Sequence, residues 1–438
     1  MANPIVAIVG RPNVGKSTLF NKITGRKISI VENKPGVTRD RIFADAEWCG
    51  KPFSLVDTGG LELKSADTMW KHIKTQVEIA IDTADVIIFV VDYKTGLGAD
   101  DYEVADKLRK SRKPVVLAVN KIDNYSPDKV FDFYELALGE PFAVSGELGQ
   151  GIGDLLDEVC ANFPEGKGEE TEDIKVAVVG KPNVGKSSLC NKLLGYERTI
   201  VSNVAGTTRD AIDTPVTVDG VNYTLIDTAG IRKKRAVDED VEYYSVLRSL
   251  SAIRRADVCV AMVDAKEGIT EQDTKICGYI HEQGKPCVVV VNKWDLIEKD
   301  TNTVNKFNKD ILEDLKFMDY VKTVYVSVKE GIRVNKILAL AKSAYDNANK
   351  RVQTGALNNL ITESVALNEP PTYQSKRLKI FYSTEVSVCP PTFVFFVNDT
   401  NLLHFSYKRY LENCIRKTFD FSGTPIRLVV RTREEDEK

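Results

Sequence analysis

Two stretches of the chain have the residue types and the spacing of a phosphate-binding loop. GRPNVGKS begins at Gly10 and GKPNVGKS begins at Gly180, each between an apolar, strand-like run and a helix-like stretch. In such a loop the backbone amides surround a phosphate, the lysine reaches the β- and γ-phosphates, and the serine hydroxyl binds Mg²⁺. A single copy also fits a structural glycine-rich turn, but two copies with shared downstream motifs favour nucleotide sites. The predicted loop residues are Gly10, Arg11, Pro12, Asn13, Val14, Gly15, Lys16, Ser17 and Thr18, and in the second copy Gly180, Lys181, Pro182, Asn183, Val184, Gly185, Lys186, Ser187 and Ser188.

A second motif, D-x-x-G, follows an apolar run in each copy, as DTGG at Asp57 and DTAG at Asp227. Its carboxylate is placed to hold Mg²⁺ through water, and the N–H of its last glycine is placed to sense the γ-phosphate. Thr38 and Thr208 lie in upstream loops, where a hydroxyl completes the Mg²⁺ coordination once a triphosphate is bound. Taken alone, the motif also fits an ordinary turn. We predict catalytic roles for Lys16, Thr38, Gly60, Lys186, Thr208 and Gly230, Mg²⁺ ligation by Ser17, Thr38, Asp57, Ser187, Thr208 and Asp227, and nucleotide contacts from Thr58, Gly59, Thr228 and Ala229.

A third motif, N-K-x-D, selects the base, and NKID at Asn120 and NKWD at Asn292 each follow a valine-rich run. A carboxylate accepts two hydrogen bonds from the N1–H and the 2-amino group of guanine, and adenine lacks that pair of donors. A buried carboxylate left unpaired opposite the wrong base costs free energy, so the motifs predict GTP and oppose an ATP-dependent kinase. The predicted base-contacting residues are Asn120, Lys121, Asp123, Asn292, Lys293 and Asp295.

The three motifs recur in the same order, which indicates a duplicated domain. Each copy alternates short Val/Ile-rich runs with longer amphipathic stretches, and this alternation predicts an α/β fold with a mainly parallel sheet and helices on both faces. In the first copy the runs are Ile5 to Val9, Phe53 to Val56, Val86 to Val91 and Val115 to Val119. We predict a first domain at 1–162, an acidic linker at 163–173, a second domain at 174–351, a small α+β domain at 352–433 and an acidic tail at 434–438.

The pattern changes in the last domain. Helix-like and strand-like stretches there predict a small α+β fold. FSYKRY from Phe405 interleaves aromatic with basic residues, which either stack on bases or pack in a core, and packing is favoured for most of them. The stretches are Thr354 to Leu367, Leu378 to Val388, Thr392 to Val397, Tyr407 to Phe419 and Ile426 to Arg431.

The composition is that of an ordinary globular protein, with 43% hydrophobic and 28% charged residues, which excludes disordered and collagen-like classes. The formal net charge is -3, so any attraction to nucleic acid is local. No apolar run approaches the ~20 residues of a membrane helix, and the N-terminus lacks the features of a signal peptide. The eight cysteines contain no C-x-x-C pair and predict reduced thiols. We expect a cytoplasmic monomer without membrane insertion.

Together the motifs resemble one family specifically, the bacterial Der, or EngA, family of tandem GTPases. The resemblance covers nearly the whole chain, through GRPNVGKST, GVTRD, DTGG and NKID, then GKPNVGKSS, GTTRD, DTAG and NKWD, and a further domain after them. It implies two P-loop GTPase domains, a KH-like last domain, GTP and GDP as ligands, and assembly of the large ribosomal subunit, with its RNA as partner. Two alternatives remain open: a GTPase with one structural or regulatory GTP-binding domain, and a GTPase acting on another RNA.

The resemblance also implies a fifth element, usually Ser-Ala, whose backbone meets the guanine oxygen. Ser145-Gly146 and Ser327-Val328 stand in its place. Because a backbone amide makes the contact, glycine should be tolerated, whereas the β-branched Val328 could alter its loop. We therefore expect the second site to be the one whose affinity is affected.

Hydrolysis is expected to be slow and to need assistance. Many signalling GTPases orient the attacking water with a glutamine after D-x-x-G, but this chain has Leu61 and Ile231 there. Asn13 and Asn183 resemble the asparagine that helps to place a potassium ion in related GTPases, although Pro-Asn also simply favours a turn. The resemblance thus implies potassium-stimulated hydrolysis, besides the Mg²⁺ cofactor.

Two further features concern RNA. The basic run RKKR from Arg232 follows the second D-x-x-G, where it is either a solvated face or an RNA contact controlled by the nucleotide. The last domain is locally basic, but it has no G-x-x-G, and Gly355 and Gly423 stand alone. It therefore lacks the backbone clamp of an ordinary KH domain, which leaves docking to ribosomal RNA or to the neighbouring GTPase domain as its expected role.

Overall fold

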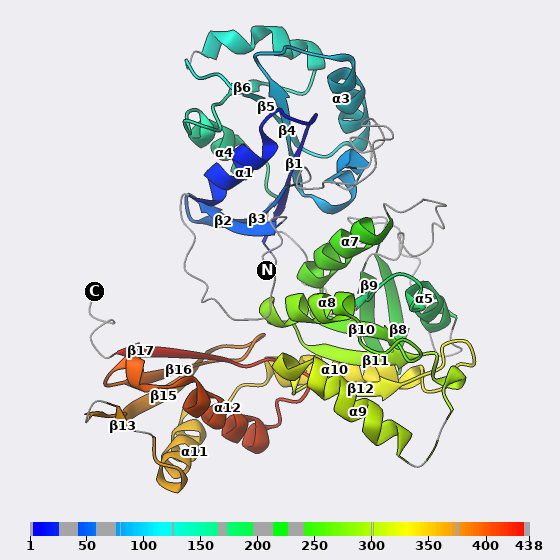
Figure 1. Ribbon diagram of the computed structural model, residues 1–438, viewed down its shortest axis with the longest axis vertical. Coiled ribbons are helices and arrows are strands. Elements are labelled where there is room, and N and C mark those ends of the chain that lie inside the picture. Colours follow the sequence, from blue (N-terminus) through cyan, green and yellow to red (C-terminus); the bar gives the residue numbers. More distant parts are fainter. Residues whose placement is uncertain are drawn as a thin grey trace. The chain divides into compact units, whose positions relative to one another are not determined.

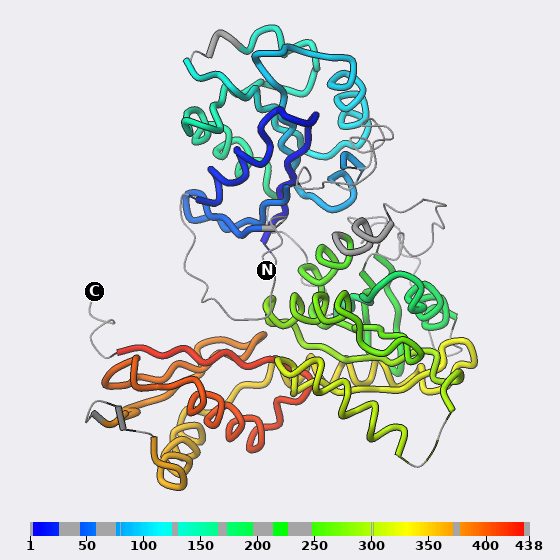
Figure 2. The backbone as a smooth tube through the Cα atoms, viewed as in Figure 1, coloured from blue at the N-terminus to red at the C-terminus, as the bar shows by residue number. Residues whose placement is uncertain are grey.

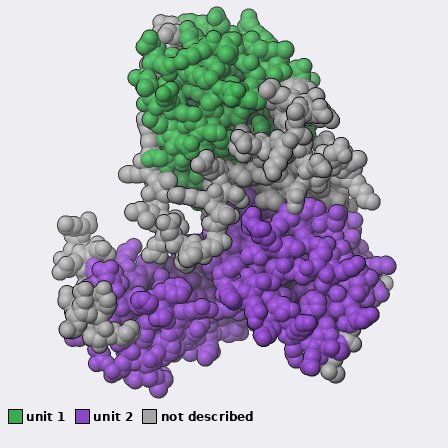
Figure 3. Space-filling view, viewed as in Figure 1, with its two compact units in different colours: residues 1–169 green, residues 170–438 purple. Residues whose placement is uncertain are grey.

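The computed structural model describes residues 3–25, 43–57, 76–78, 80–124, 127–164, 173–195, 213–226, 241–298, 300, 302–370, 372–373 and 376–432. The chain forms two compact units, residues 1–169 and 170–438, which Figure 3 distinguishes by colour. Several predicted features lie outside the described residues: Thr38, Thr58, Gly59, Gly60, Leu61, Thr208, Asp227, Thr228, Ala229, Gly230, Ile231, the basic run 232–235, most of the linker and the acidic tail.

The first unit is built on a six-stranded sheet in the order β2-β3-β1-β4-β5-β6 (Figure 1). The pair β2 and β3 is antiparallel and the other neighbours are parallel. β1 and β4 are buried along their whole length, because parallel strands covered on both faces must be apolar throughout. The strands are β1 (Ile5–Val9), β2 (Phe43–Trp48), β3 (Lys51–Asp57), β4 (Val86–Asp92), β5 (Val115–Asn120) and β6 (Pro141–Ala143).

Helices cover both faces of this sheet. Alternate residues of each strand point to opposite faces, so one core lies under α1 (Lys16–Thr24) and α4 (Ile152–Ala161). The other core lies under α3 (Ala99–Ser111) and the 3₁₀ helix η1 (Pro127–Leu136). The sheet therefore holds the residues that follow its strands at one edge, between two helical layers.

The second unit begins with the same architecture. Its first sheet has the order β12-β11-β10-β7-β9-β8, which is the strand order of the first unit read from the other edge. Its strands are β7 (Ile174–Val179), β8 (Thr214–Val218), β9 (Val221–Ile226), β10 (Val258–Asp264), β11 (Cys287–Asn292) and β12 (Lys322–Tyr325). Its helices are α5 (Lys186–Leu194), α7 (Val241–Arg255), α8 (Glu271–Glu282), η2 (Trp294–Leu296), α9 (Thr303–Asp314), η3 (Lys316–Met318) and α10 (Asn335–Asn349).

A small α+β domain follows α10, as the backbone trace in Figure 2 shows. Its three-stranded sheet has the order β15-β16-β17, with β15 antiparallel and β17 parallel to β16. One core joins this sheet to its two helices. The elements are α11 (Thr354–Leu367), β13 (Thr372–Tyr373), β14 (Lys376–Arg377), β15 (Ile380–Ser387), β16 (Thr392–Val397), η4 (Thr400–Leu402), α12 (Phe405–Phe419) and β17 (Arg427–Thr432). The predicted fold class, two α/β domains and a small α+β domain, is confirmed.

The small domain is joined to the preceding α/β domain through Gly423. The Gly423 N–H donates to the Tyr320 carbonyl at 2.8 Å, and the Gly423 carbonyl accepts the Cys287 N–H at 2.8 Å. Gly423 has φ +81°, and a Cβ there would lie 2.6 Å from the Ala344 Cβ, so the position requires glycine. The Arg416 guanidinium lies 4.7 Å from the centre of the Tyr320 ring and adds a cation–π contact.

In the FSYKRY segment, Tyr407 is buried and donates to the Asn368 carbonyl at 2.7 Å, and the Tyr410 hydroxyl donates to the Ser364 carbonyl at 3.0 Å. Phe405 is exposed. Two of these three aromatic side chains thus pack within the domain, and the third faces solvent.

The cysteines are all free thiols. Burial raises the pKa of Cys259 and Cys277 to about 12, so these two thiols stay protonated and pack as small apolar groups. No described helix is long and apolar enough to cross a membrane.

Candidate nucleotide-binding sites

Each phosphate loop connects the first strand of its sheet to the helix that begins at the loop lysine. In the first domain Gly15 caps α1 with φ +93°, and a Cβ there would lie 2.3 Å from the Asn120 Nδ2. Gly185 repeats this geometry at the start of α5, where a Cβ would lie 2.4 Å from the Asn292 Nδ2. The glycines therefore let the loop approach the N-K-x-D strand, and the free amides at the helix N-terminus are those that bind phosphate.

The loop lysines lie folded back on their own loops. Lys16 Nζ donates to the Gly10 and Arg11 carbonyls, each at 2.8 Å, and Lys186 Nζ donates to the Gly180 and Lys181 carbonyls, each at 2.7 Å. Burial lowers the pKa of both lysines from 10.5 to about 8, and the Asp57 carboxylate offsets part of this for Lys16. If these lysines bind phosphate as the motifs predict, phosphate oxygens would replace the carbonyls as their acceptors.

The remaining polar loop residues face outward. Asn13 and Asn183 have φ of 66° and 63°, in the left-handed region that asparagine tolerates. The hydroxyl residues of the first helical turns are exposed in both domains: Ser17, Thr18, Ser187 and Ser188.

The first-domain residues fit a Mg²⁺ ion. Ser17 lies exposed in the first turn of α1, and Asp57 is buried at the end of β3. Asp57 lies beside Ile8 in the pairing of β3 with β1, two residues before the phosphate loop begins. Hydroxyl and carboxylate oxygens are ligands that Mg²⁺ prefers. In the second domain Ser187 occupies the position of Ser17, and its carboxylate partner lies outside the described residues.

The first asparagine of each N-K-x-D motif joins the phosphate loop to the loop after the last strand. Asn120 Nδ2 donates to the Val14 carbonyl at 2.8 Å, and its Oδ1 accepts the Gly146 N–H at 2.9 Å. Asn292 makes the same two contacts, to the Val184 carbonyl at 2.8 Å and the Val328 N–H at 3.0 Å. Both loops are also closed by a β-bridge, Ser145 with Gln150 and Ser327 with Ile332. The asparagine contact and the β-bridge are thus present with valine in the second loop as with glycine in the first.

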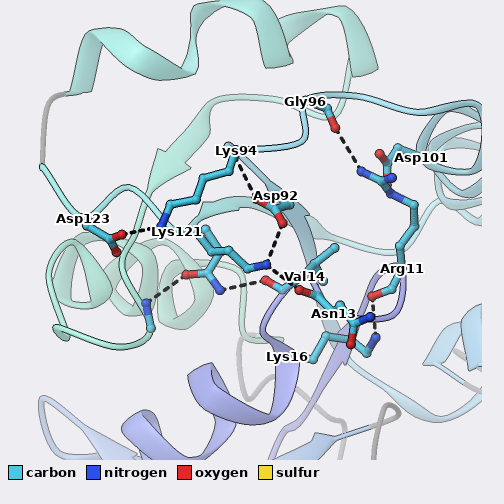
Figure 4. Close-up of polar contacts among 12 residues, drawn as sticks. Arg11, Asn13, Val14, Lys16, Asp92, Lys94, Gly96, Asp101, Lys121 and Asp123 are labelled. Atoms are coloured by element: carbon cyan, nitrogen blue, oxygen red, sulfur yellow. Dashed lines mark hydrogen bonds and ion pairs between the residues drawn. The ribbon is translucent and has the colours of Figure 1, made fainter.

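The motif lysines bridge to a carboxylate at the end of the neighbouring strand. Lys121 Nζ donates to the Asn13 carbonyl at 2.6 Å and to Asp92 Oδ2 at 2.7 Å (Figure 4). In the second domain Lys293 Nζ lies 2.5 Å from Asp264 Oδ2. Burial raises the pKa of Asp264, but the Lys293 hydrogen bond and charge outweigh it and leave the pKa below its usual range.

The carboxylate of Asp123, which the sequence predicts to select the base, is held by two side chains. Asp123 accepts a hydrogen bond from Lys94 Nζ at 2.6 Å (Figure 4). It accepts another from the Ser145 hydroxyl at 3.3 Å. The Lys94 hydrogen bond lowers the pKa of Asp123. The carboxylate is therefore ionised at neutral pH, as recognition of the two guanine donors requires. Asp295 is half-buried in the equivalent turn of the second domain.

Sequence reasoning missed the carboxylates Asp92 and Asp264. Both end strands that are otherwise wholly apolar, in ADVIIFVVD and ADVCVAMVD. An acidic residue that recurs at the end of a fully buried run was the available signal, because a buried carboxylate needs a partner. The structure supplies that partner as the motif lysine.

A phosphate loop at the end of the first strand and an N-K-x-D motif at the end of a parallel strand two positions along the same sheet define a P-loop GTPase domain. The chain contains this arrangement twice. It is thus a GTP-binding protein with two G domains.

The comparisons with known proteins agree with this class. The family described as "50S ribosome-binding GTPase" matches residues 5–121 and 175–293, and the family described as "KH-domain-like of EngA bacterial GTPase enzymes, C-terminal" matches residues 351–431. "GTPase Der" of Ruminiclostridium cellulolyticum is 57% identical over 440 residues, covering 100% of both chains. "GTPase Der" of Clostridium perfringens is 55% identical over 438 residues, covering 99% of this chain and 100% of that protein.

Among solved structures, the G domain of the Thermotoga maritima FeoB iron transporter is 30% identical and covers 36% of this chain and 98% of that chain, with a TM-score of 0.27. Era in complex with MgGDPNP and a segment of 16S ribosomal RNA is 23% identical and covers 60% of this chain and 93% of that chain, with a TM-score of 0.31. The full-length relatives decide the assignment. The chain belongs to the Der, or EngA, family of GTPases, which bind GTP and GDP, hydrolyse GTP and, as GTPases generally do, use Mg²⁺.

Proposed function

We propose that this GTPase is a nucleotide-dependent assembly factor for the large ribosomal subunit. The observation that carries the proposal is that both G domains match the family described as "50S ribosome-binding GTPase". The locally basic KH-like domain supports it, because a protein of net charge -3 needs a local surface to bind RNA. We propose that the protein acts in the cytoplasm as a monomer, and light scattering of the purified chain tests the monomeric state.

One surface of the KH-like domain suits an RNA contact without a G-x-x-G clamp. A cavity of about 460 Å³ lies between α11 and the segment 377–382, and its lining includes Lys379, the half-exposed Tyr382 and Arg377, which is paired with Glu369. Basic side chains can pair with phosphate, and an exposed aromatic ring can stack on a base. Reversal of charge at Lys379 should therefore weaken binding to ribosomal RNA.

Co-sedimentation with ribosomal subunits tests the proposal. The protein is incubated with isolated large and small subunits in GDP, in a non-hydrolysable GTP analogue and without nucleotide. We expect the large subunit to retain it, most strongly with the GTP analogue, and Lys379→Glu to weaken the retention. Equal binding to both subunits in all three conditions would contradict the proposal and would favour a GTPase that acts on another RNA.

Charge reversal in the basic run 232–235 tests whether the second switch region contacts RNA. If that run contacts RNA under control of the nucleotide, its reversal removes the difference between the GDP and GTP-analogue states. The Lys379→Glu variant is the matched control, because it lowers binding in both states. Retention that still differs between the states after reversal would count against gating by this run.

We further propose that intrinsic hydrolysis is slow and is stimulated by potassium. Leu61 and Ile231 cannot hydrogen-bond to water, so neither orients the nucleophile. Asn13 and Asn183 are exposed within the phosphate loops, and an amide side chain has an oxygen that can bind a monovalent cation.

We also propose the roles that the motifs predict for the phosphate-loop, Mg²⁺-binding and base-contacting residues, together with the predicted domain boundaries.

Turnover in potassium and in sodium buffers of equal ionic strength tests the role of the cation. We expect about a tenfold faster rate in potassium, because a cation at the phosphates replaces part of the charge of an arginine finger. Asn13→Ala and Asn183→Ala should each remove the stimulation at one site. Equal rates in the two salts would contradict the proposal that potassium stimulates hydrolysis.

A further inference from the structure

The residue after the first glycine of each phosphate loop contacts an acidic residue of a helix, α3 in the first domain and α8 in the second. In the first domain Arg11 Nε donates to Asp101 Oδ1 at 2.7 Å, and its terminal nitrogen donates to the Gly96 carbonyl at 2.9 Å (Figure 4). Asp101 is 0% exposed, and its other oxygen accepts the Gly98 N–H at 3.0 Å. The buried carboxylate therefore has a donor on each oxygen.

The same connection is incomplete in the second domain. Lys181 Nζ donates to the more exposed Glu267 at 2.6 Å and lies 3.6 Å from Asp273 Oδ2. That oxygen also accepts from the backbone N–H and the hydroxyl of Thr270, at 3.0 and 2.6 Å. Asp273 is 2% exposed, and its Oδ1 has no hydrogen-bond partner among the residues that the structure describes.

The difference follows from the chemistry of the two cations. A guanidinium presents donors in a fixed, planar fork and reaches a carboxylate and a carbonyl at once, whereas an ammonium is a point charge on a flexible stem. Lys181 pairs with the nearer, more exposed acid and leaves an oxygen of the buried one unsatisfied. A buried polar atom without a partner is unfavourable, so this loop is the less firmly held of the two.

The connection matters because the tied residue also holds the catalytic lysine. The Arg11 carbonyl accepts a hydrogen bond from Lys16, and the Lys181 carbonyl accepts one from Lys186. A side chain fixed at one end therefore fixes the peptide group that places the ammonium. No contact of these side chains with nucleotide is needed for this effect.

We infer that Arg11 with Asp101 and Lys181 with Asp273 are positioning pairs that hold the phosphate loops in the shape that receives GTP. The first pair is complete and the second is not, so the first site binds GTP more tightly although the motif residues match. The inference rests on GTP binding and hydrolysis by the family and is independent of the ribosomal role proposed above.

Exchange of the two cations tests the inference. Lys181→Arg is placed in a chain whose first site is disabled by Lys16→Ala, and Arg11→Lys in a chain disabled by Lys186→Ala. KM and kcat for GTP are measured, with the Kd of fluorescent GDP as an independent measure. We expect KM and Kd to fall about fivefold for Lys181→Arg and to rise about fivefold for Arg11→Lys, with kcat changed less than about twofold.

Glu267→Gln is the matched control in the Lys16→Ala chain. It removes the charge of the exposed partner of Lys181 and should change KM less than about twofold, as is usual for exposed ion pairs. Thermal unfolding of each variant verifies folding, and either exchange alone is decisive if the other variant fails to fold. Unchanged KM and Kd after the exchange would overturn the inference, and so would a change confined to kcat.

Discussion

The two N-K-x-D turns carry the same polar contacts on different supports. In the first domain Ile122 is a small, buried part of the aliphatic core. In the second, Trp294 packs against Tyr325 and Phe307, with ring centres 4.4 and 5.0 Å apart. The hydrogen bonds of Asn120 and Asn292 nevertheless agree to within 0.1 Å. The geometry of the site is thus insensitive to how the turn behind it is filled.

The outer surfaces beside these turns differ more. The first domain continues into the 3₁₀ helix η1, whose Phe131 and Tyr134 are 64% and 47% exposed. The second domain has the α-helix α9 there, and its Phe307 turns inward onto Trp294. The two domains therefore share the hydrogen bonds around the N-K-x-D asparagine, while the outer surfaces beside these turns differ.

Of the changes considered, replacement of a phosphate-loop lysine should make the turnover rates of the two sites differ most. Lys16→Ala removes the ammonium that neutralises phosphate charge at the first site, and turnover there should fall about a thousandfold, as it should at the second site in Lys186→Ala. If both sites are enzymes, each single variant keeps the rate of the other site, and the double variant loses both. Phosphate release from the three variants is the measurement. A single variant without turnover would assign a structural or regulatory role to the other site.

Replacement of the base-selecting carboxylate tests whether the two turns are functionally equal. Asp123→Asn and Asp295→Asn keep one acceptor but place an amide NH2 opposite the 2-amino group of guanine, so GTP affinity at the altered site should fall about a hundredfold, while affinity for a xanthine nucleotide, which has an acceptor there, rises. Titration with fluorescent guanine and xanthine nucleotides, site by site, measures this. Losses that differ more than tenfold between the sites would mean that the supports behind Ile122 and Trp294 do matter.

The pH dependence of binding should be shared by the sites. Both loop lysines have a pKa of about 8 in the empty site, below their ordinary 10.5, so they lose the proton above pH 8. Phosphate favours the ammonium, binding then takes up a proton, and GDP affinity should fall about eightfold from pH 7.5 to 9.0. The unfolding free energy changes in the opposite direction from GDP affinity. Above pH 8 the lysines of the folded, empty protein lose their protons, whereas in the unfolded chain they keep them up to about pH 10.5. The unfolding free energy of the empty protein therefore rises above pH 8.

Calorimetric titration with GDP across this range reads the proton uptake. Lys16→Arg and Lys186→Arg keep their charge throughout and serve as controls that also correct for titration of guanine itself. A pH slope that persists in the arginine variant would assign the effect to another group. A pH slope at one site alone would show that the two lysines differ in pKa, although the structure gives both a pKa of about 8.

Exchange of Gly146 and Val328 should have the smallest effect. Both residues contribute only a backbone N–H to the asparagine contact. A Cβ at Gly146 would meet the Leu19 nitrogen at 3.3 Å, which is tight but can be relieved by a small shift. We expect Gly146→Val and Val328→Gly each to change GDP affinity less than about threefold, as measured by fluorescence titration. A larger loss for Gly146→Val alone would show that the first loop is the less tolerant.

The strands that carry the site were predictable because a strand covered on both faces must be apolar throughout. Val86 to Val91 and Val115 to Val119 each proved to be a strand with one further residue, Asp92 and Asn120. Those two polar ends are where site chemistry begins, and hydrophobicity alone does not include them. In the small domain, Thr354 to Leu367 and Thr392 to Val397 agree with the structure to the residue.

The supporting contacts could not be predicted in the same way. Arg11 and Asp101 are 90 residues apart, and no local period relates them. In the sequence Asp101 is only one of two acids in the first turn of α3, where acids are common because they favour the helix dipole. Its complete burial depends on how α3 lies against the phosphate loop, which is a property of the packed sheet. The contacts within each motif were predictable, and those between motifs needed the fold.

The backbone contacts of Gly423 have a consequence for how this protein can be divided. A gene fragment that ends near residue 351 would leave the Cys287 N–H and the Tyr320 carbonyl without their partners and would uncover the Tyr320 ring. Such a fragment should be prone to aggregation, whereas residues 170–438 would retain every one of these contacts. A breakpoint for recombination, or for expression of separate parts, therefore falls before residue 170 rather than after the second G domain.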